Sequence, residues 1–498
     1  MKSLLPENIS NILFTSLEIL TALFIFAVGL VCVVVVVLYF IDRHQTKQTI
    51  RRNYPVIGRF RYFFEHIGEF FRQYFFAMDR EELPFNRAQR SWVYRAAKNL
   101  DNTVAFGSTK DLSKPGSIMF VNTAYPTLSQ DTAEISPLLI GANCRHPFTA
   151  KSIVNISGMS FGALSKPAVQ ALSHGAAKAG CWMNTGEGGL SPWHLEGGCD
   201  LVFQIGTAKY GVRDEAGNLS DQKLKNIASH ENVRMFEIKL SQGAKPGKGG
   251  ILPANKVTEE IASIRGIKVG EASISPNRHP EIKNAGDLMD MVEHVREVTG
   301  KPTGFKAVLG SPKWLDELFT EIKQRGIHQA PDFITLDSCD GGTGAAPMAL
   351  MDDVGLPIRE SLPILVNKLN EYGLRERIKV ICSGKLITPS AVATAICVGA
   401  DFIVSARGFM FSLGCIQALQ CNKNTCPTGI TTHDEHLQQG LDPTNKAERV
   451  YHYHHNIQYE VATIAHSCGV AEPRLLQRHH ARMVMSDGHS AGLDELYD

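Results

Sequence analysis

The chain has 498 residues, with 51 Lys and Arg against 50 Asp and Glu and a formal net charge of +1. This balance argues against a nucleic-acid binder, because that class is usually strongly basic. Hydrophobic residues make up 44% of the chain and charged residues 20%, which allows a large core and excludes wholesale disorder. The 11 cysteines are too sparse for a disulfide scaffold, so we expect them to be reduced.

The first predicted element is an apolar segment near the N-terminus. Ile19–Ile41 is 23 residues long and carries no charge, and a bilayer core needs about 20 such residues. A cleavable signal peptide is the alternative, but its apolar region would span only about 7 to 15 residues and end in small residues. Here the run ends in Tyr39-Phe40-Ile41-Asp42-Arg43. We therefore expect a transmembrane anchor over residues 1–45.

The charges that flank this segment predict its orientation. Residues 43–95 carry 11 Lys and Arg and 5 Asp and Glu, whereas residues 1–18 carry one Lys and two Glu. Positive charge stays on the cytoplasmic side of a membrane helix. We therefore expect a single-pass protein of the cell (inner) membrane, in contact with lipid, whose larger C-terminal part faces the cytoplasm. This location agrees with reduced cysteines.

Residues 46–110 read as a basic and aromatic juxtamembrane linker. Between residues 56 and 76, nine Phe and Tyr residues are mixed with Arg59, Arg61 and Arg72. One interpretation is a membrane-surface helix, with its rings at headgroup level and its arginines on lipid phosphates. The other is a linker helix that packs on the globular part. The sequence favours neither.

From about residue 100, short apolar runs alternate with helical patterns. Strands separated by helices pair in parallel, and eight strands over about 250 residues fit a closed (β/α)8 TIM barrel, an α/β fold. A doubly wound open sheet is the alternative, but no G-x-G-x-x-G follows the first strand. Ala272–Ser275 is either a ninth strand or a loop. The predicted strands are Ile153–Ser157, Cys181–Thr185, Leu201–Ile205, Met235–Leu240, Gly304–Leu309, Phe333–Asp337, Lys379–Ser383 and Asp401–Ala406. The predicted helices are Lys166–Ala179, Thr258–Arg265, Ala285–Val298, Pro312–Arg325, Arg359–Tyr372 and Pro389–Val398.

Glycine-rich loops follow several of these strands. In barrels that bind phosphate, the site often uses the loops after strands seven and eight, which here read Ser383-Gly384-Lys385 and Ser405-Ala406-Arg407-Gly408. Glycine lets backbone N–H groups approach a phosphate, and Lys or Arg adds positive charge. Ordinary turns with surface bases are the alternative. Further glycine-rich loops at 184–189, 245–250 and 340–344 favour a flat, phosphorylated cofactor, and FMN fits.

A third feature is a run of cysteines with the spacing C-x5-C-x4-C, at Cys415, Cys421 and Cys426. A structural zinc site usually has C-x2-C pairs and four ligands. Three thiolates within so short a run instead suit an iron–sulfur cluster that lacks one protein ligand, and a final Cys-Pro also occurs in ferredoxins. Buried free thiols are the alternative. A flavin site directly upstream favours the cluster.

Taken together, these blocks resemble the flavin-binding domain of glutamate synthase. The likeness runs from Met159-Ser160-Phe161-Gly162-Ala163-Leu164-Ser165 to Cys426-Pro427-Thr428-Gly429, roughly residues 150–480. Between them lie, in order, Asn184 to Gly189, Gly243-Ala244-Lys245-Pro246-Gly247, Ile274-Ser275-Pro276 and Asp340 to Pro347. The resemblance implies that residues 111–498 form a (β/α)8 barrel with FMN, a 3Fe-4S cluster loop and C-terminal helices. It also implies an oxidoreductase that reduces 2-iminoglutarate, formed from 2-oxoglutarate and ammonia, to L-glutamate.

The resemblance also implies a role for each matching residue. Glu187 would handle the protons of the imine, and Lys239 and Lys245 would place positive charge beside the flavin and the oxo acid. Arg265, Gln242 and Met159 would bind the substrate, and the planar fork of Arg265 would hold a carboxylate. The remaining cofactor-binding residues would be Ser160, Gly162, Ala163, Thr185, Gln204, Lys306, Gly341, Gly342, Ser383, Gly384, Lys385, Ala406 and Arg407. The cluster ligands would be Cys415, Cys421 and Cys426.

The chain departs from the family pattern at several points. Ile251 stands where the family has a Gln that contacts the oxo acid, and Lys248 stands where it has a Glu. An FMN oxidoreductase that acts on another amino or oxo acid, coupled to the membrane, is therefore the alternative function. A membrane segment replaces the family's glutaminase domain, so we expect ammonia to arrive in trans. Electrons would come from ferredoxin or a separate reductase subunit. A non-catalytic membrane scaffold is a third hypothesis, and it predicts a colourless protein.

Overall fold

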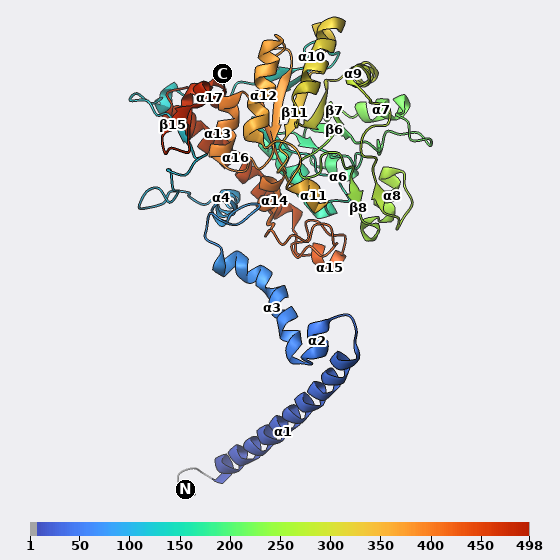
Figure 1. Ribbon diagram of the computed structural model, residues 1–498, viewed down its shortest axis with the longest axis vertical. Coiled ribbons are helices and arrows are strands. Elements are labelled where there is room, and N and C mark those ends of the chain that lie inside the picture. Colours follow the sequence, from blue (N-terminus) through green and yellow to red (C-terminus); the bar gives the residue numbers. More distant parts are fainter. Residues whose placement is uncertain (1–6, 498) are drawn as a thin grey trace. The chain divides into compact units, whose positions relative to one another are not determined.

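The structure is a computed structural model that describes residues 7–497, apart from the side chains of residues 7–10, 69, 70, 72 and 73. The first six residues of the predicted anchor and the side chain of Arg72 therefore lie outside the description. The chain divides into an N-terminal unit that ends at Arg87 and a C-terminal unit that begins at Ala88 (Figure 1). The two units are described separately below.

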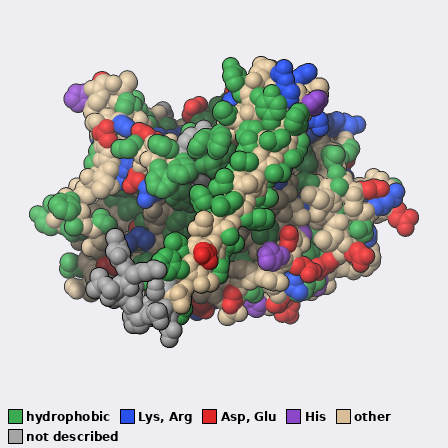
Figure 2. All heavy atoms as spheres, turned by 90° about the horizontal axis from the view of Figure 1, so that it is seen from below, with side chains coloured by type: hydrophobic (Ala, Val, Ile, Leu, Met, Phe, Trp, Pro, Cys, Tyr) green, Lys and Arg blue, Asp and Glu red, His purple; other side chains and the backbone are tan. Residues whose placement is uncertain are grey.

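Three helices dominate the N-terminal unit: α1 (Glu7–His44), α2 (Thr49–Asn53) and α3 (Ile57–Phe71). Within α1, the segment Asn11–His44 is long and apolar enough to cross a membrane. Apart from the buried Asp42, its side chains are largely exposed, and in Figure 2 its hydrophobic atoms form a nearly uncharged band. By length and composition the helix could span a bilayer, although a signal sequence shares these properties.

Eight parallel strands of the C-terminal unit close into a barrel. The first strand pairs with the last, with Val154 opposite Ile403, so the sheet has no open edge and the doubly wound alternative is excluded. Each of the eight predicted strands is present. They are β4 (Val154–Ile156), β5 (Met183–Asn184), β6 (Leu201–Ile205), β7 (Val233–Lys239), β10 (Thr303–Val308), β11 (Phe333–Asp337), β12 (Lys379–Ser383) and β13 (Phe402–Ser405).

Helices between the strands form the outer layer of the barrel (Figure 1). The six predicted helices are present, and the first of them, α5 (Lys166–Ala179), is capped at both ends. The hydroxyl of Ser165 accepts from the backbone N–H of Ala168, and Gly180 ends the same helix with a left-handed φ of 68°. The six are α5 (Lys166–Ala179), α8 (Glu259–Arg265), α9 (Ala285–Thr299), α10 (Lys313–Arg325), α12 (Ile358–Glu371) and α13 (Pro389–Val398).

The long helix α16 (Pro443–Ser467) packs against α5. Close approach needs glycine at the contact, because a Cβ added to Gly175 would lie 2.5 Å from the side chain of Val450. The other helices are α4 (Arg87–Ala97), α6 (Pro192–Leu195), α7 (Asp221–Ala228), α11 (Met348–Met351), α14 (Arg407–Leu413), α15 (Glu435–Gln438) and α17 (Leu493–Tyr497).

The remaining strands lie outside the barrel. Ala272–Ser275, left open between strand and loop, contains β9 (Ser273–Ile274), which pairs antiparallel with β8 (Ile251–Leu252). This β8–β9 pair, whose strands are joined through α8, brings Ile251 to the rim of the barrel. The others are β1 (Ile118–Phe120), β14 (Ala481–Val484) and β15 (Ser490–Gly492) in one sheet, and β2 (Leu138–Ile140) with β3 (Phe148–Ala150) in another.

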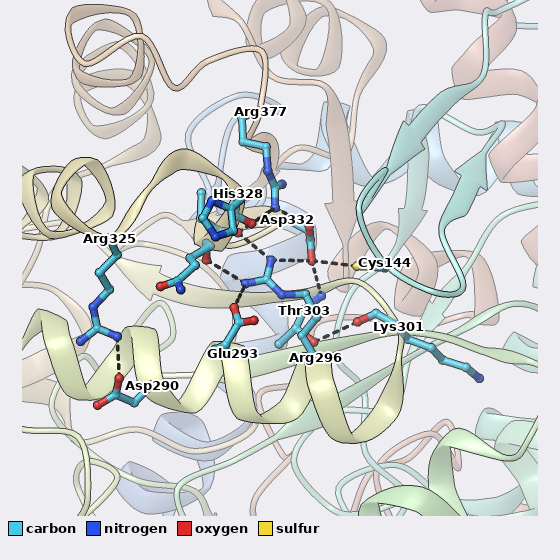
Figure 3. Close-up of polar contacts among 12 residues, drawn as sticks. Cys144, Asp290, Glu293, Arg296, Lys301, Thr303, Arg325, His328, Asp332 and Arg377 are labelled. Atoms are coloured by element: carbon cyan, nitrogen blue, oxygen red, sulfur yellow. Dashed lines mark hydrogen bonds and ion pairs between the residues drawn. The ribbon is translucent and has the colours of Figure 1, made fainter.

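A buried ionic cluster lies at the N-terminal end of the barrel strands (Figure 3). Asp332, directly before β11, is fully buried and accepts from the backbone N–H of Thr303 at 2.9 Å. Its carboxylate lies 2.9 Å from Arg377 and 3.5 Å from Arg296. Burial, then Asp332, raises the pKa of the neighbouring Cys144 thiol to about 12. The cluster contributes to the fold, since the carboxyl ends of the strands, where barrel chemistry takes place, lie at the opposite end.

Candidate active site

One pocket opens at the carboxyl ends of the barrel strands, the end at which barrel enzymes place their chemistry. It brings together most of the residues that the sequence singles out, from segments spread over more than 260 positions between Met159 and Cys421. Among the predicted residues, those that line it are Met159, Ser160, Ala163, Glu187, Gln204, Lys239, Gln242, Lys245, Arg265, Lys306, Gly342, Ser383, Gly384, Lys385, Ala406, Arg407 and Cys421.

The other predicted residues lie next to the lining rather than in it. Gly162, Thr185 and Gly341 each adjoin a lining residue in the chain, and Thr185 is fully buried. Cys415 and Cys426 are buried at the two ends of the cysteine loop, which we define as residues 415–426. Its middle member, Cys421, faces the pocket.

Glu187 and Lys239 form an ion pair in the pocket. The Glu187 carboxylate lies 3.2 Å from the Lys239 ammonium, which also bonds to the side-chain amide oxygen of Gln242. Burial raises the pKa of Glu187, but the positive charges of Lys239 and Lys245 lower it by more. The pKa therefore lies below its usual value. Glu187 is therefore a carboxylate at neutral pH. It lies beside the Lys239 ammonium, which could donate a proton to it.

Glycine determines where this carboxylate can lie. A Cβ added to Gly250 would come within 2.0 Å of Glu187 Oε1, and one added to Gly206 within 2.5 Å of Glu187 Cβ. Any larger residue at these positions would displace the carboxylate. Gly250 directly precedes β8, so the start of this strand lies against Glu187.

Positive charge exceeds negative charge around the carboxylate. Burial, then the nearby Lys239, lowers the pKa of Lys245 to about 8. Arg265 is also buried, and its guanidinium donates to the hydroxyl of Ser273 at 3.3 Å and the carbonyl of Phe161 at 3.4 Å. Its Nε has no hydrogen-bond partner. Because a buried cation without a counter-ion is costly, this part of the pocket suits an anion.

The floor of the pocket rests on a carboxylate that sequence reasoning missed. Glu237 is buried inside the barrel, where it accepts from the amides of Asn184 at 2.8 Å and Gln204 at 2.6 Å and from the hydroxyl of Thr335. Gln204 lines the pocket, so Glu237 fixes its orientation. Polar residues at alternate positions of β7, Glu237 and Lys239, were the available signal.

A second buried ion pair lies beside this floor. The Lys306 ammonium is 3.0 Å from the Asp337 carboxylate, which also accepts from the backbone N–H of Gly243 at 3.0 Å. Burial lowers the pKa of Lys306, but Asp337 and Glu237 raise it above its usual value. Lys306 therefore stays charged under the pocket, where it could stabilise negative charge on a bound ring.

The loops after β12 and β13, where the sequence predicts a phosphate cradle, line the pocket. Gly384 has a φ of 124°, and a Cβ there would lie 2.2 Å from the side chain of Ser338, so only glycine fits. The ammonium of Lys385 points to this region and lies 2.9 Å from the carboxylate of Asp340. Glycines at the pocket wall and an adjacent cation fit the phosphate of FMN.

The Arg407 side chain contacts the cysteine loop as well as the loop after β11. Its guanidinium donates to the carbonyl of Thr343 and lies 3.8 Å from Cys421 Sγ. Burial lowers its pKa, but Cys421, Cys415 and Cys426 together raise it above the usual value. Arg407 therefore joins the pocket wall to the cysteine loop.

The cysteine loop has a tight conformation. Gln417, Leu419 and Asn424 all have left-handed φ, of 59°, 54° and 62°, which is rare outside glycine. Burial raises the pKa of the Cys426 thiol, but bonds from neighbouring threonine groups lower it below the usual value. Among residues 7–497, no three Cys, His, Asp or Glu side chains are arranged closely enough to hold a metal ion. The thiols and the nearby cations fit a cluster in chemical type, since thiolates ligate iron and cations offset their charge.

Lys256 is a second residue that the sequence did not single out. It lies on a short turn before α8, and its ammonium donates to the carbonyls of Ala163 and Cys421, both at 3.1 Å. Burial lowers its pKa to about 8, although Cys421 and Cys426 act in the opposite direction. One side chain thus joins the loop after β4 to the cysteine loop. Only the folded contacts reveal it.

With this geometry established, comparison with known proteins is informative. Residues 97–471 match the family described as the conserved region in glutamate synthase. The chain belongs to the glutamate synthase family. Membership makes the protein an oxidoreductase, and the closed barrel agrees with the fold that the sequence resemblance implied.

Three curated relatives show how far the likeness extends. The glutamate synthase large subunit-like protein YerD of Bacillus subtilis is 39% identical over 96% of this chain and 98% of its own length. The archaeal glutamate synthase [NADPH] of Methanocaldococcus jannaschii is 32% identical over 66% of this chain, which spans 61% of that relative. A glutamate synthase large subunit-like protein of Rhizobium meliloti is 29% identical, over 65% of this chain and 73% of its own. The similarity to YerD thus includes the N-terminal unit.

Proposed function

We propose that the protein reduces 2-iminoglutarate to L-glutamate, with ammonia and electrons supplied by other proteins. The observation that carries the proposal is the grouping of Glu187, Lys239 and Lys245 in a cation-rich pocket beside the glycine cradle. The chain's place in the glutamate synthase family supports it. The name of the archaeal relative also pairs this family with glutamate synthesis.

The residues of the pocket suit the steps of this reaction. Ammonia and 2-oxoglutarate condense to the imine and water, and the imine then takes up a hydride and a proton to give glutamate. Arg265 and Lys245 would hold the two carboxylates of the oxo acid. Glu187 and Lys239 would relay the proton at the imine nitrogen over their 3.2 Å contact. FMN, when bound, supplies the hydride, and it would be held by the loops at Gly342, Gly384 and Lys385.

The cysteine loop is assigned to electron entry in this proposal. Cys415, Cys421 and Cys426 would hold a 3Fe-4S cluster, which supplies single electrons when bound. The contact between Arg407 and Cys421 supports this assignment, because it links the loop directly to the pocket wall. A ferredoxin or a separate reductase subunit would deliver the electrons from the cytoplasm. Helix α1 would anchor the enzyme to the cell membrane, as its apolar length supports.

A visible spectrum of the purified full-length protein tests the cofactors first. We expect flavin bands and a broad iron–sulfur absorption, and a colourless protein would contradict both assignments. Cys421→Ser should lose iron but keep flavin, whereas Cys468→Ser, a buried thiol outside the loop, should keep both. Equal iron in the two variants would refute the assigned ligands.

An anaerobic titration tests the reaction itself. Glutamate should reduce the flavin, and 2-oxoglutarate with ammonia should reoxidise it. Glu187→Gln should bind flavin normally but react about 100 to 10,000 times more slowly, the usual loss when a general acid or base is removed. A coloured protein that responds to neither acid would contradict the glutamate reaction.

A second candidate follows from Ile251, which lines the pocket beside Gly250. A branched apolar side chain cannot hydrogen-bond to a distal carboxylate, so it favours an acid with a less polar chain. The candidate is a membrane-linked oxidoreductase for another amino or oxo acid. Reduction of the flavin by an apolar amino acid, but not by glutamate, would favour it.

A further inference from the structure

Helix α3 carries an apolar stripe that faces solvent. Ile57, Phe60, Phe64, Ile67 and Phe71 recur at intervals of three or four residues, which places them on one face. The exposed fractions of four of them are 73% for Ile57, 58% for Phe60, 62% for Phe64 and 45% for Phe71. So large an exposed aromatic surface marks an interaction site.

The start of α3 is held by one buried carboxylate. Asp42, in the last turn of α1, is fully buried and lies 2.6 Å from Arg51 and 2.8 Å from Arg59. It also accepts from the backbone N–H of Val56 at 3.0 Å. Val56 has a φ of 64°, a conformation that β-branched residues rarely adopt. We name this group the Asp42 clasp; it fixes the direction in which α3 leaves α1.

Exposed basic side chains surround the clasp. Arg43, Lys47, Arg52 and Arg61 are all exposed, and none of them belongs to the clasp itself. Basic groups beside an aromatic stripe suit an anionic phospholipid surface, where rings enter the acyl boundary and cations bind phosphates. The stripe begins at Ile57, shortly after α1 ends at His44, so a bilayer that holds α1 would place this surface within reach of α3.

We propose that α3 lies in the plane of an anionic membrane surface, with its stripe below the headgroups and its direction set by the Asp42 clasp. This inference rests on the proposed membrane anchor. It assigns the segment after α1 a second membrane contact, in addition to the spanning helix. The competing interpretation, in which the stripe packs on the barrel, is an outcome of the test below.

Tryptophan fluorescence in nanodiscs of brominated phosphatidylcholine and phosphatidylglycerol tests this placement on the full-length protein. The four native tryptophans all follow residue 88 and provide the baseline. Phe64→Trp adds a reporter to the stripe, and His66→Trp adds one to the opposite face of the same helix. We expect bromine to quench the Phe64→Trp reporter at least twofold more than the His66→Trp reporter, and less so without phosphatidylglycerol. Equal quenching overturns the proposal, as does a Phe64→Trp reporter shielded from acrylamide but not quenched by bromine.

Two further variants separate the anchor from the stripe. Val34→Trp reports on α1, and its quenching with an unquenched Phe64→Trp overturns the α3 proposal alone. An unquenched Val34→Trp overturns the anchor and the inference with it. Asp42→Asn, combined with Phe64→Trp, should reduce the added quenching at least twofold, and unchanged quenching refutes the role of the clasp.

Discussion

The ammonium of Lys256 and the carbonyl of Cys421 are joined by a 3.1 Å hydrogen bond, and the same ammonium bonds to the carbonyl of Ala163. The cysteine loop and the loop after β4 therefore share one buried donor. Lys256→Met should loosen both loops, because a buried polar group that loses its partner costs about 1–3 kcal/mol. Hydrogen exchange of amides 415–426 should therefore rise by at least about fivefold.

Lys423→Met is the matched control for this change, since Lys423 is exposed in the same loop. It removes one ammonium but no buried contact, so the exchange rates should stay as they are. Equal exchange in both variants would show that the loop does not depend on the buried lysine.

The pH dependence of catalysis should follow Lys245. Its pKa of about 8 lies below the usual 10.5 because burial and Lys239 disfavour the charged form, so its charge is present below pH 8 and is lost above it. The value of kcat/KM for an anionic oxo acid should therefore be level near pH 7 and decline by about tenfold per pH unit well above pH 8. Lys245→Arg keeps the charge, so this decline should disappear. A decline at the same pH in the arginine variant would assign it to another group.

Asp332 should contribute far more to stability than other acids of the same region. Asp332→Asn removes a buried charge between Arg296 and Arg377, which should cost about 3–5 kcal/mol of unfolding free energy. Asp290→Asn, which breaks the exposed pair with Arg325 in Figure 3, should cost at most about 1 kcal/mol. Denaturant midpoints measure both, and similar losses would contradict the ranking by burial.

Ile251 should determine the affinity for 2-oxoglutarate. Ile251→Gln introduces an amide at the pocket wall, and a hydrogen bond to a charged group contributes about 1.5–3 kcal/mol, or roughly 10-fold to 100-fold in KM. Steady-state kinetics with 2-oxoglutarate and with 2-oxobutyrate, which lacks the distal carboxylate, measure the change. An equal effect on both acids would show that the residue at position 251 does not contact the distal carboxylate.

The barrel could be predicted because its strands are short and largely buried, with helices between them. The same pattern predicts where each strand ends, and the pocket of a barrel lies at those C-terminal ends. The pairing of β8 with β9 could not be predicted, since a two-residue strand such as Ser273–Ile274 is too short to show a periodic pattern of apolar residues. Its pairing depends on contacts between separate loops.

The site was predicted less completely for a similar reason. Glu187, Lys239 and the cysteines stand in motifs, whereas Lys256 stands in none, and its burial depends on two carbonyls far away in the chain. Glu237 could have been noticed, because a carboxylate in the middle of a buried strand requires partners. The direction of the Arg407 side chain, toward the cysteine loop, could be known only from coordinates.

The ionic cluster around Asp332 and the pocket around Glu187 occupy opposite ends of the same eight strands. Substitutions in the loops at the carboxyl ends of the strands can therefore accumulate without weakening the Asp332 cluster at their N-terminal ends. Substitutions at the N-terminal ends likewise leave the pocket intact. Evolution can change the acid that the enzyme accepts, through positions such as Ile251, while the stability of the fold stays above the level that function requires. Protein engineering for a new substrate has the same freedom, provided that the residues around Asp332 at the N-terminal ends of the strands are kept.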